Sequence, residues 1–266
     1  TAVIAAAHVI ILVCSKDLGS ALIFFVVYVL MVVVASRNWL YLLAGVSGGS
    51  VAAYLAYRVF PHIQVRVQAF KDPWSVIDST GYQITQSLFA ITSGGWFGLG
   101  LFKGTQESIP FVEADFIFSA IAEELGLLFA LCVILICVSS FVMFMNISMN
   151  LKDKFYQLTA FGLGVTYIFQ VFLTIGGGCK FIPLTGVTLP FISYGGSSVL
   201  TTLIMFSITE GLSMIQEEEA EEEKHRRKRI RQKKKKQAGR KKDRPVYEYE
   251  DLDFEEDGET FEQEEE

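Results

Sequence analysis

Histidine and cysteine are scarce in this sequence, and the phosphate-binding motifs of nucleotide enzymes are absent. The 266 residues include 3 His and 4 Cys, none with a partner at the spacing of a metal site. Cys14, Cys132, Cys137 and Cys179 lie in or beside apolar runs, where a thiol usually packs as a small hydrophobic group. We therefore predict neither a zinc site nor a disulfide. Neither a Walker A sequence nor GxGxxG occurs, so nucleotide binding is not expected.

Charged side chains are also scarce outside the C-terminal part of the chain. Residues 217–266 hold 14 of the 23 Lys and Arg and 19 of the 29 Asp and Glu, which leaves 9 basic and 10 acidic side chains for residues 1–216. The chain is 51% hydrophobic and contains 22 Phe, too apolar for an ordinary soluble domain. This composition predicts an all-α, polytopic helical bundle in a membrane, followed by a disordered charged tail over residues 217–266.

The N-terminus lacks an initiator methionine and the ordered regions of a signal peptide. Thr1 opens directly onto the apolar run AVIAAAHVIILVC. We therefore expect this chain to be the later part of a longer, N-terminally truncated protein.

Apolar runs predict about six membrane segments within residues 1–216. The first, residues 2–14, is too short to cross a bilayer alone. The others are expected over residues 18–35, 39–57, 115–146, 155–175 and 199–215. Residues 58–114 form a long amphipathic stretch that no single span explains, and the Gly- and Pro-rich residues 176–198 are expected to be largely irregular.

Basic residues in the short loops predict the orientation of these segments. If the basic tail is cytoplasmic, Arg37, Lys152 and Lys154 also lie inside, as the positive-inside rule requires. Residues 58–114 and 176–198 then lie outside together. The tail is either simply solvated or attracted to anionic lipids through the basic run that begins at Lys224. Nucleic-acid binding is not predicted, because the run is tethered to a membrane and flanked by acidic residues.

Carboxylates gather around Asp115, at the mouth of an apolar run that reads IPFVEADFIFSAIAEELG over residues 109–126. Ionisable groups at this place are costly and usually carry function. We predict that Asp115 is the working residue, with a helix N-cap as its alternative role. Glu123 and Glu124 are expected to support the structure, as a pair or as a polar seam between helices.

Glycines and cations accompany this carboxylate in the predicted outer segments. The glycines of GYQITQSLFAITSGGWFGLGLFKG, residues 81–104, would allow close approach of the backbone to a ligand. Arg58, Arg66, Lys71, Lys103 and Lys180 lie on the same predicted side, where they could bind a phosphorylated head group. The alternative for each is an interfacial cation whose stem lies along apolar surface.

Five strings in the same order resemble the SEDS family, the FtsW/RodA/SpoVE proteins of bacterial division, elongation and sporulation. They are KDLGSAL, GYQITQSL, GGWFGLGL, ADFIFSAIAEELG and PLTGVTLPFISYGGSS, and the resemblance covers about residues 16–200. It implies the later part of a ten-helix fold in the bacterial cytoplasmic membrane. It also implies a peptidoglycan glycosyltransferase that polymerises lipid II outside that membrane, with a class B penicillin-binding transpeptidase as partner.

The resemblance assigns roles to particular residues of this chain. Asp115 matches the family's essential aspartate, and Glu107 matches an acidic position in many members. Gln86 and Ser193 lie within the matching strings. We predict that Asp115 is catalytic and that six side chains bind the substrate: Glu107, Lys103, Arg66, Gln86, Lys180 and Ser193.

The chemistry of joining two lipid-linked disaccharides agrees with a single carboxylate. Asp115 would act as general base on an acceptor hydroxyl, and the leaving diphosphate would need positive charge. Arg and Lys side chains or a divalent cation such as Mg²⁺ could supply that charge, and the cofactor stays open. Two other functions also fit a polytopic protein with carboxylates near the membrane: a flippase or transporter of a lipid-linked precursor, and a membrane scaffold of the cell-wall synthesis complex.

Overall fold

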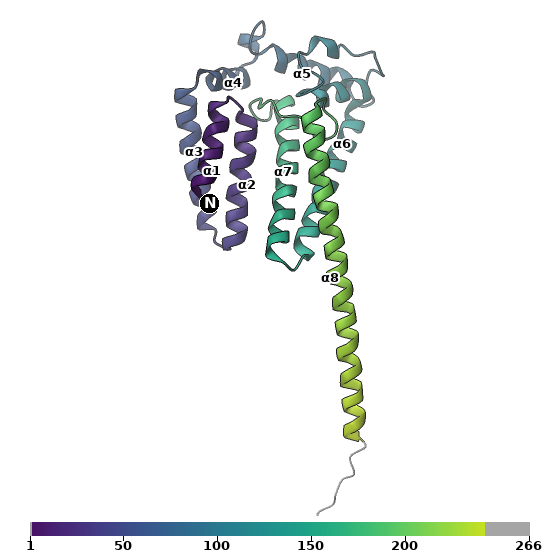
Figure 1. The fold of residues 1–266 in the computed structure, drawn as a ribbon. Coiled ribbons are helices and arrows are strands. Elements are labelled where there is room, and N and C mark those ends of the chain that lie inside the picture. The colour runs from purple at the N-terminus through teal and green to yellow at the C-terminus, as the bar shows by residue number, and fades with distance from the viewer. Residues whose placement is uncertain (1, 243–266) are drawn as a thin grey trace, which may run out of the picture. The chain divides into compact units, whose positions relative to one another are not determined.

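The computed structural model describes the backbone of residues 2–242 and the side chains of residues 3–232. Its regular structure in that range is helical, as predicted (Figure 1). The α-helices are α1 (Ala2–Cys14), α2 (Leu18–Ser36), α3 (Leu40–Val59), α4 (Pro61–Lys71), α5 (Tyr82–Gly94), α6 (Ile117–Asn150), α7 (Lys154–Gly178) and α8 (Gly196–Lys242), with short 3-10 helices η1 (Trp74–Val76) and η2 (Gln106–Ser108).

Five of these helices are long and apolar enough to cross a membrane. They are α2, α3, α6, α7 and the part of α8 from Gly196 to Gln232. Helix α1 is apolar but shorter. These helices confirm the predicted all-α, polytopic membrane fold.

The chain divides into two compact units, Thr1–Glu219 and Ala220–Glu266. The first unit contains the packed helices, the loops and both cavities described below. In the second unit the described residues continue α8 as a helix to Lys242.

The helix beyond residue 216 differs from the predicted disorder of the tail. Residues 217–236 are mostly Glu, Lys, Arg and Ala, which are strong helix formers, and acidic residues precede basic ones by one turn. Glu223 and Arg227 form one such i, i+4 pair, with 2.6 Å between Oε1 and Nη2, a spacing that stabilises helices modestly. The remainder of the predicted tail, residues 243–266, lies outside the described residues.

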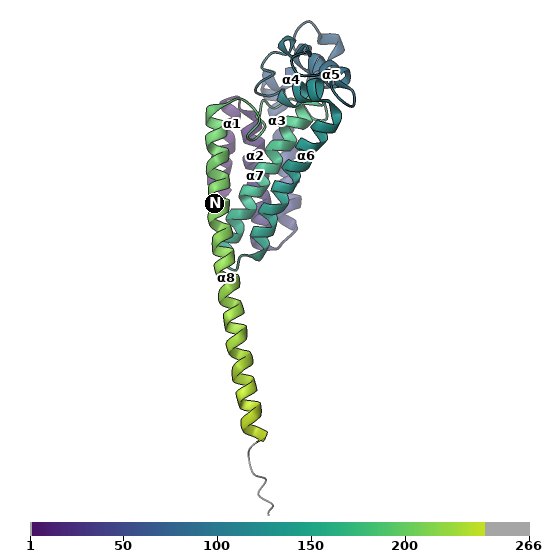
Figure 2. The same ribbon diagram turned by 90° about the vertical axis from the view of Figure 1, so that its right-hand side faces the viewer.

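Within the first unit, two sets of loops lie at opposite ends of the helices (Figures 1 and 2). The α1–α2 turn, residues 60–116 with α4 and α5, and residues 179–195 form what we call the loop end. Arg66 and Tyr194 join its parts, because Arg66 Nη1 donates to the Leu184 carbonyl at 3.0 Å and the Tyr194 N–H donates to the Glu113 carbonyl at 2.8 Å. The α2–α3 and α6–α7 turns lie at the opposite end.

Helix α6 is not the continuous helix that the sequence predicts from Asp115 onward. It begins at Ile117 and breaks at Gly126, where φ is 83° and ψ is 173°. A Cβ on Gly126 would lie 2.4 Å from the Gly98 nitrogen, so the close approach of the 95–100 loop requires glycine here. The break exposes backbone groups to that loop, and the Leu127 N–H donates to the Gly95 carbonyl at 2.9 Å.

An aromatic cluster holds α6, α7 and α8 together in the first unit. Phe144 is fully buried, its ring centroid lies 5.1 Å from that of Phe206, and Tyr167 lies 5.5 Å from Phe206. Edge-to-face pairs of this kind stabilise a packed core beyond their buried area. They provide a rigid base for the loops above them.

Candidate functional site

Asp115 lies in a tight turn immediately before α6. The N–H groups of Ala114 and Asp115 both donate to the Phe111 carbonyl, at 3.0 and 3.2 Å. The N-cap of α6 is Phe116, so the alternative role of Asp115 as helix N-cap is wrong. Its carboxylate is therefore available for another purpose.

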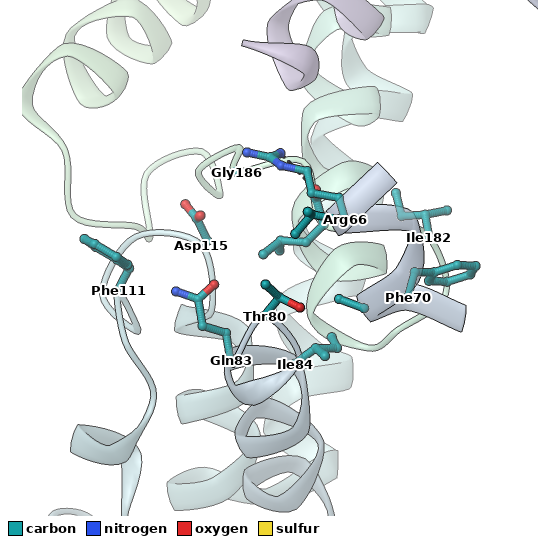
Figure 3. Close-up of a pocket in the computed structure, with 12 residues that line it drawn as sticks. Arg66, Phe70, Thr80, Gln83, Ile84, Phe111, Asp115, Ile182 and Gly186 are labelled. Carbon is teal, nitrogen blue, oxygen red and sulfur yellow. Dashed lines mark hydrogen bonds between the residues drawn. The ribbon is translucent and has the colours of Figure 1, made fainter. Parts of the chain in front are cut away.

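That carboxylate lines a cavity of about 370 Å³ at the loop end (Figure 3). The size is within the range of ligand pockets in proteins. Helix α4 supplies Arg66, the start of α5 supplies Gln83, and the 182–186 loop closes one side. The lining residues are Val65, Arg66, Ala69, Phe70, Thr80, Gln83, Ile84, Phe111, Asp115, Ile182, Leu184 and Gly186.

Gly186 allows the backbone to come close to the Asp115 carboxylate. Its φ is +77°, and a Cβ built on it would lie 3.6 Å from Asp115 Oδ2. An L-residue would be strained in this conformation and would narrow the space beside the carboxylate. Figure 3 shows Gly186 between Asp115 and the Arg66 guanidinium.

Burial and a nearby cation act on Asp115 in opposite directions. Loss of water around the half-buried carboxyl raises its pKa above the usual range, and the Arg66 guanidinium opposes this by lowering the pKa. Burial is the larger effect. A carboxylate with a raised pKa is a stronger base, so this arrangement places a group capable of general base chemistry near a fixed positive charge.

Buried serines fix the elements that carry the site. Ser193 Oγ donates to the Ala114 carbonyl at 2.5 Å and accepts from the Leu189 N–H at 2.7 Å. Ser87 Oγ and Ser119 Oγ are 2.6 Å apart and join α5 to α6. Ser87 also donates to the Gly178 carbonyl of α7 at 2.8 Å.

The structure brings together only part of the predicted set of site residues. Asp115 and Arg66 share the cavity. Gln86 lies outside its lining, with Oε1 3.5 Å from Ser108 Oγ, and Ser193 is buried with its hydroxyl bonded to the backbone.

The other three predicted substrate ligands also lie outside this lining. Lys103 and Glu107 are exposed, and Lys180 is half-buried with a positive φ of 56° at the end of α7. Sequence reasoning missed Thr80, Gln83 and Phe111. Gln83 stands in the same GYQITQSL string as Gln86, and only the start of α5 decides which amide faces the cavity.

Glu123 and Glu124 are buried and have structural partners, as expected, although they join α6 to a loop. Glu123 Oε1 accepts from the Thr105 N–H at 2.9 Å and from Thr105 Oγ1 at 3.1 Å. Glu124 Oε1 accepts from the Phe102 N–H at 3.0 Å and from Gln106 Nε2 at 3.1 Å. These bonds shape the 95–107 loop around the broken helix.

A second cavity of about 450 Å³ lies between α2, α7 and α8 and also reaches Gly186. Hydroxyl and amide groups dominate its polar lining, with Asp17 as its one carboxylate. Its polar members are Asp17, Ser20, Thr166, Gln170, Thr188, Ser197, Ser198, Thr201 and Thr202. The two cavities therefore adjoin across the Gly186 backbone.

Metal-ligating side chains do not cluster near either cavity. Within the described part of the chain, no three His, Cys, Asp or Glu side chains lie together in a way that could hold a metal ion. Each cavity offers one carboxylate.

Comparison with known proteins agrees with the strings and the fold. The sequence profile of the FtsW/RodA/SpoVE cell cycle proteins matches residues 1–218. The chain belongs to this family. It is accordingly a multi-pass membrane protein, as its five candidate spans also indicate.

Curated relatives carry the names of both branches of the family. The peptidoglycan glycosyltransferase RodA of Mycobacterium tuberculosis (strain ATCC 25618 / H37Rv) is 36% identical over 203 residues, 76% of this chain and 43% of the relative. A probable peptidoglycan glycosyltransferase FtsW of Aliivibrio salmonicida is 35% identical over 197 residues, 72% of this chain and 49% of the relative. The chain spans about half the length of these relatives.

A solved structure shares the fold. It is named "Structural coordination of polymerization and crosslinking by a peptidoglycan synthase complex", and the match has a TM-score of 0.64 at 24% identity. The match covers 78% of this chain and 59% of that chain.

Proposed function

We propose that this chain forms the catalytic part of a peptidoglycan glycosyltransferase that polymerises lipid II at the outer face of the bacterial cytoplasmic membrane. The observation that carries the proposal is the cavity in which the Asp115 carboxylate lies opposite the Arg66 guanidinium. The names of the relatives support the same activity. Division, elongation and sporulation are all compatible with this site.

The proposed orientation places the loop end outside. Lys152 and Lys154 lie in or beside the α6–α7 turn and Arg37 lies at the α2–α3 turn, both at the end opposite Asp115 (Figure 1). Short loops rich in Lys and Arg face the cytoplasm. Residues 1–216 would then be the membrane core and residues 217–266 a cytoplasmic tail.

The proposed reaction joins two lipid-linked sugars by replacing a diphosphate oxygen at the anomeric carbon with a hydroxyl oxygen. A hydroxyl oxygen of the acceptor attacks the anomeric carbon of the donor, and Asp115 takes the hydroxyl proton. The bond between that carbon and the diphosphate oxygen breaks, and the diphosphate leaves with the electron pair. Arg66 stabilises the negative charge on the leaving group, and one well-placed base contributes about 10² to 10⁴ in rate.

Two adjoining cavities suit a reaction with two large substrates. The Asp115 cavity holds the reacting hydroxyl, and the hydroxyl-lined cavity between α2, α7 and α8 accommodates a second polar head group. Both reach Gly186, where the groups would meet. Hydroxyl and amide side chains can donate hydrogen bonds to sugar and phosphate oxygens.

The proposed partners follow from the same activity. A class B penicillin-binding transpeptidase would crosslink the polymer, which agrees with the name of the structurally similar synthase complex. The basic run that begins at Lys224 would contact anionic lipids of the inner leaflet.

The decisive experiment compares two neighbouring carboxylates in a lipid II polymerisation assay. Asp115→Asn should abolish polymer formation and leave the detergent-solubilised protein folded. Glu113→Gln is the matched control, because Glu113 is exposed, and it should retain activity. Polymer formed by Asp115→Asn would refute Asp115 as the base. Lipid translocation that survives Asp115→Asn, with no polymer formed by the wild type, would favour the flippase instead.

A further inference from the structure

Residues Trp96–Phe102, WFGLGLF, form a loop with an unusually exposed apolar surface. We call it the WFGLGLF loop. Phe102 is 91% exposed, Phe97 83%, Trp96 63% and Leu101 62%. Large apolar side chains gathered in this way need to be covered by lipid or by another protein.

The loop lies beside the first turn of the membrane-spanning part of α6. The Leu127 N–H donates to the Gly95 carbonyl at 2.9 Å, and the Leu128 N–H donates to the Trp96 carbonyl at 3.3 Å. Residues 127–150 follow the break and would extend about 36 Å, slightly more than the roughly 30 Å of hydrocarbon in a bilayer. The loop therefore stands at the level where the hydrocarbon begins.

The backbone of the loop is turned inward and bonded to α6. The N–H groups of Leu99 and Gly100 donate to the carbonyls of Glu123 and Glu124, at 2.9 and 3.0 Å. The Phe102 N–H donates to Glu124 Oε1 at 3.0 Å. Irregular backbone enters a low-dielectric region only when its polar groups are satisfied within the protein, and these groups are.

The apolar surface of the loop continues that of α6. Leu128, Leu131 and Leu135 are 46%, 44% and 66% exposed, and in a membrane protein such leucines face lipid. Trp and Phe next to a Lys, here Lys103, are the composition of an interfacial belt. Lipid would therefore cover the loop as it covers the adjacent part of α6.

We propose that the WFGLGLF loop inserts its side chains into the boundary between head groups and acyl chains of the adjoining leaflet. The occupant of this surface is lipid. The loop then acts as an anchor that holds the broken N-terminal part of α6, and the turn before it, at a fixed height above the bilayer. This inference rests on the membrane-spanning helices and is independent of the proposed catalytic activity.

Spin labels at three positions test the insertion in reconstituted vesicles of phosphatidylglycerol and phosphatidylethanolamine. With the other cysteines replaced, labels are placed by Phe102→Cys, Leu135→Cys and Asp78→Cys, all at exposed positions. The label at position 135 should lie in the hydrocarbon, and the label at position 78 should lie in water. We expect the ratio of oxygen to nickel-chelate accessibility at position 102 to be severalfold above that at 78 and below that at 135. A value at 102 equal to that at 78 would overturn the proposal.

Tryptophan fluorescence provides a second measurement that needs no label. The difference between the emission of the wild type and of Trp96→Phe isolates Trp96 from the other tryptophans. Lipids brominated near the head group should quench this difference signal. If the signal is unquenched in vesicles and position 102 becomes shielded only when a transpeptidase is added, the surface binds protein and the proposal fails.

Discussion

The Tyr194 N–H donates a hydrogen bond to the Glu113 carbonyl at 2.8 Å, two residues before Asp115. The preceding residue, Ser193, donates to the Ala114 carbonyl. Two consecutive residues of the 179–195 loop thus hold two consecutive residues of the turn that carries the carboxylate. The position of Asp115 therefore depends on a segment more than 70 residues away in the chain.

Ser193→Ala should reduce polymerisation between about tenfold and hundredfold, because small displacements of a catalytic group have effects of this size. The change leaves the buried Leu189 N–H without its acceptor, at a cost of about 1–3 kcal/mol in stability. Polymerisation and thermal unfolding measure the two effects. Ser50→Ala is the control, since Ser50 is exposed on α3 and donates within its own helix. Equal loss of activity in both variants would contradict the role of Ser193.

Arg66→Gln should move the acid limb of the pH–rate profile to higher pH. Asp115 must be deprotonated to act as base, and Arg66 lowers its pKa. Removal of this positive charge therefore raises the pKa of Asp115, and activity appears only at higher pH. Arg66→Lys, which keeps the charge, should shift the limb less.

The control for this profile is Arg58→Gln. Arg58 is exposed on α3, outside the cavity lining, and its Cζ lies 5.8 Å from the centroid of the Tyr54 ring. Its acid limb should match that of the wild type. A common shift in both variants would indicate a general effect of surface charge instead.

The residues around Asp115 show how far sequence reasoning reaches. Apolar runs predict the spans because length and composition alone determine whether a helix suits a membrane, and the same pattern singles out Asp115. Gln83, Thr80 and Gly186 meet Asp115 only through contacts between distant segments. The sequence pattern could not distinguish Gln83 from Gln86, because those contacts decide which face of α5 borders the cavity. It also could not show that Lys103 lies outside the cavity, because the direction of a side chain in irregular backbone depends on the same contacts.

The break in α6 was missed for the same reason, and it predicts a matched pair of glycine variants. Gly126→Ala should lower stability by about 2–4 kcal/mol, because its φ is +83° and a Cβ would lie 2.4 Å from the Gly98 nitrogen. In Gly48→Ala, the new Cβ would meet no heavy atom within 4 Å among the described residues. That helix-interior change should stabilise α3 by about 0.5–1 kcal/mol. Thermal unfolding in detergent compares the two, and an equal response would refute the requirement for glycine at the break.

Glu123→Gln should retain polymerase activity within about threefold, in contrast to Asp115→Asn. Glu123 is 1% exposed, and its Oε1 accepts both hydrogen bonds from Thr105, which the amide oxygen of glutamine can also accept. Glu123→Leu removes this acceptor and leaves the Thr105 groups unpaired, so it should cost about 1–3 kcal/mol of stability. Polymerisation by Glu123→Gln tests whether the reaction needs the negative charge of Glu123, and thermal unfolding of Glu123→Leu measures how much the hydrogen bonds to Thr105 stabilise the fold. If Glu123→Gln were as inactive as Asp115→Asn while remaining folded, the negative charge of Glu123 would itself be needed for the reaction, and Asp115 would not be the only working carboxylate at the loop end.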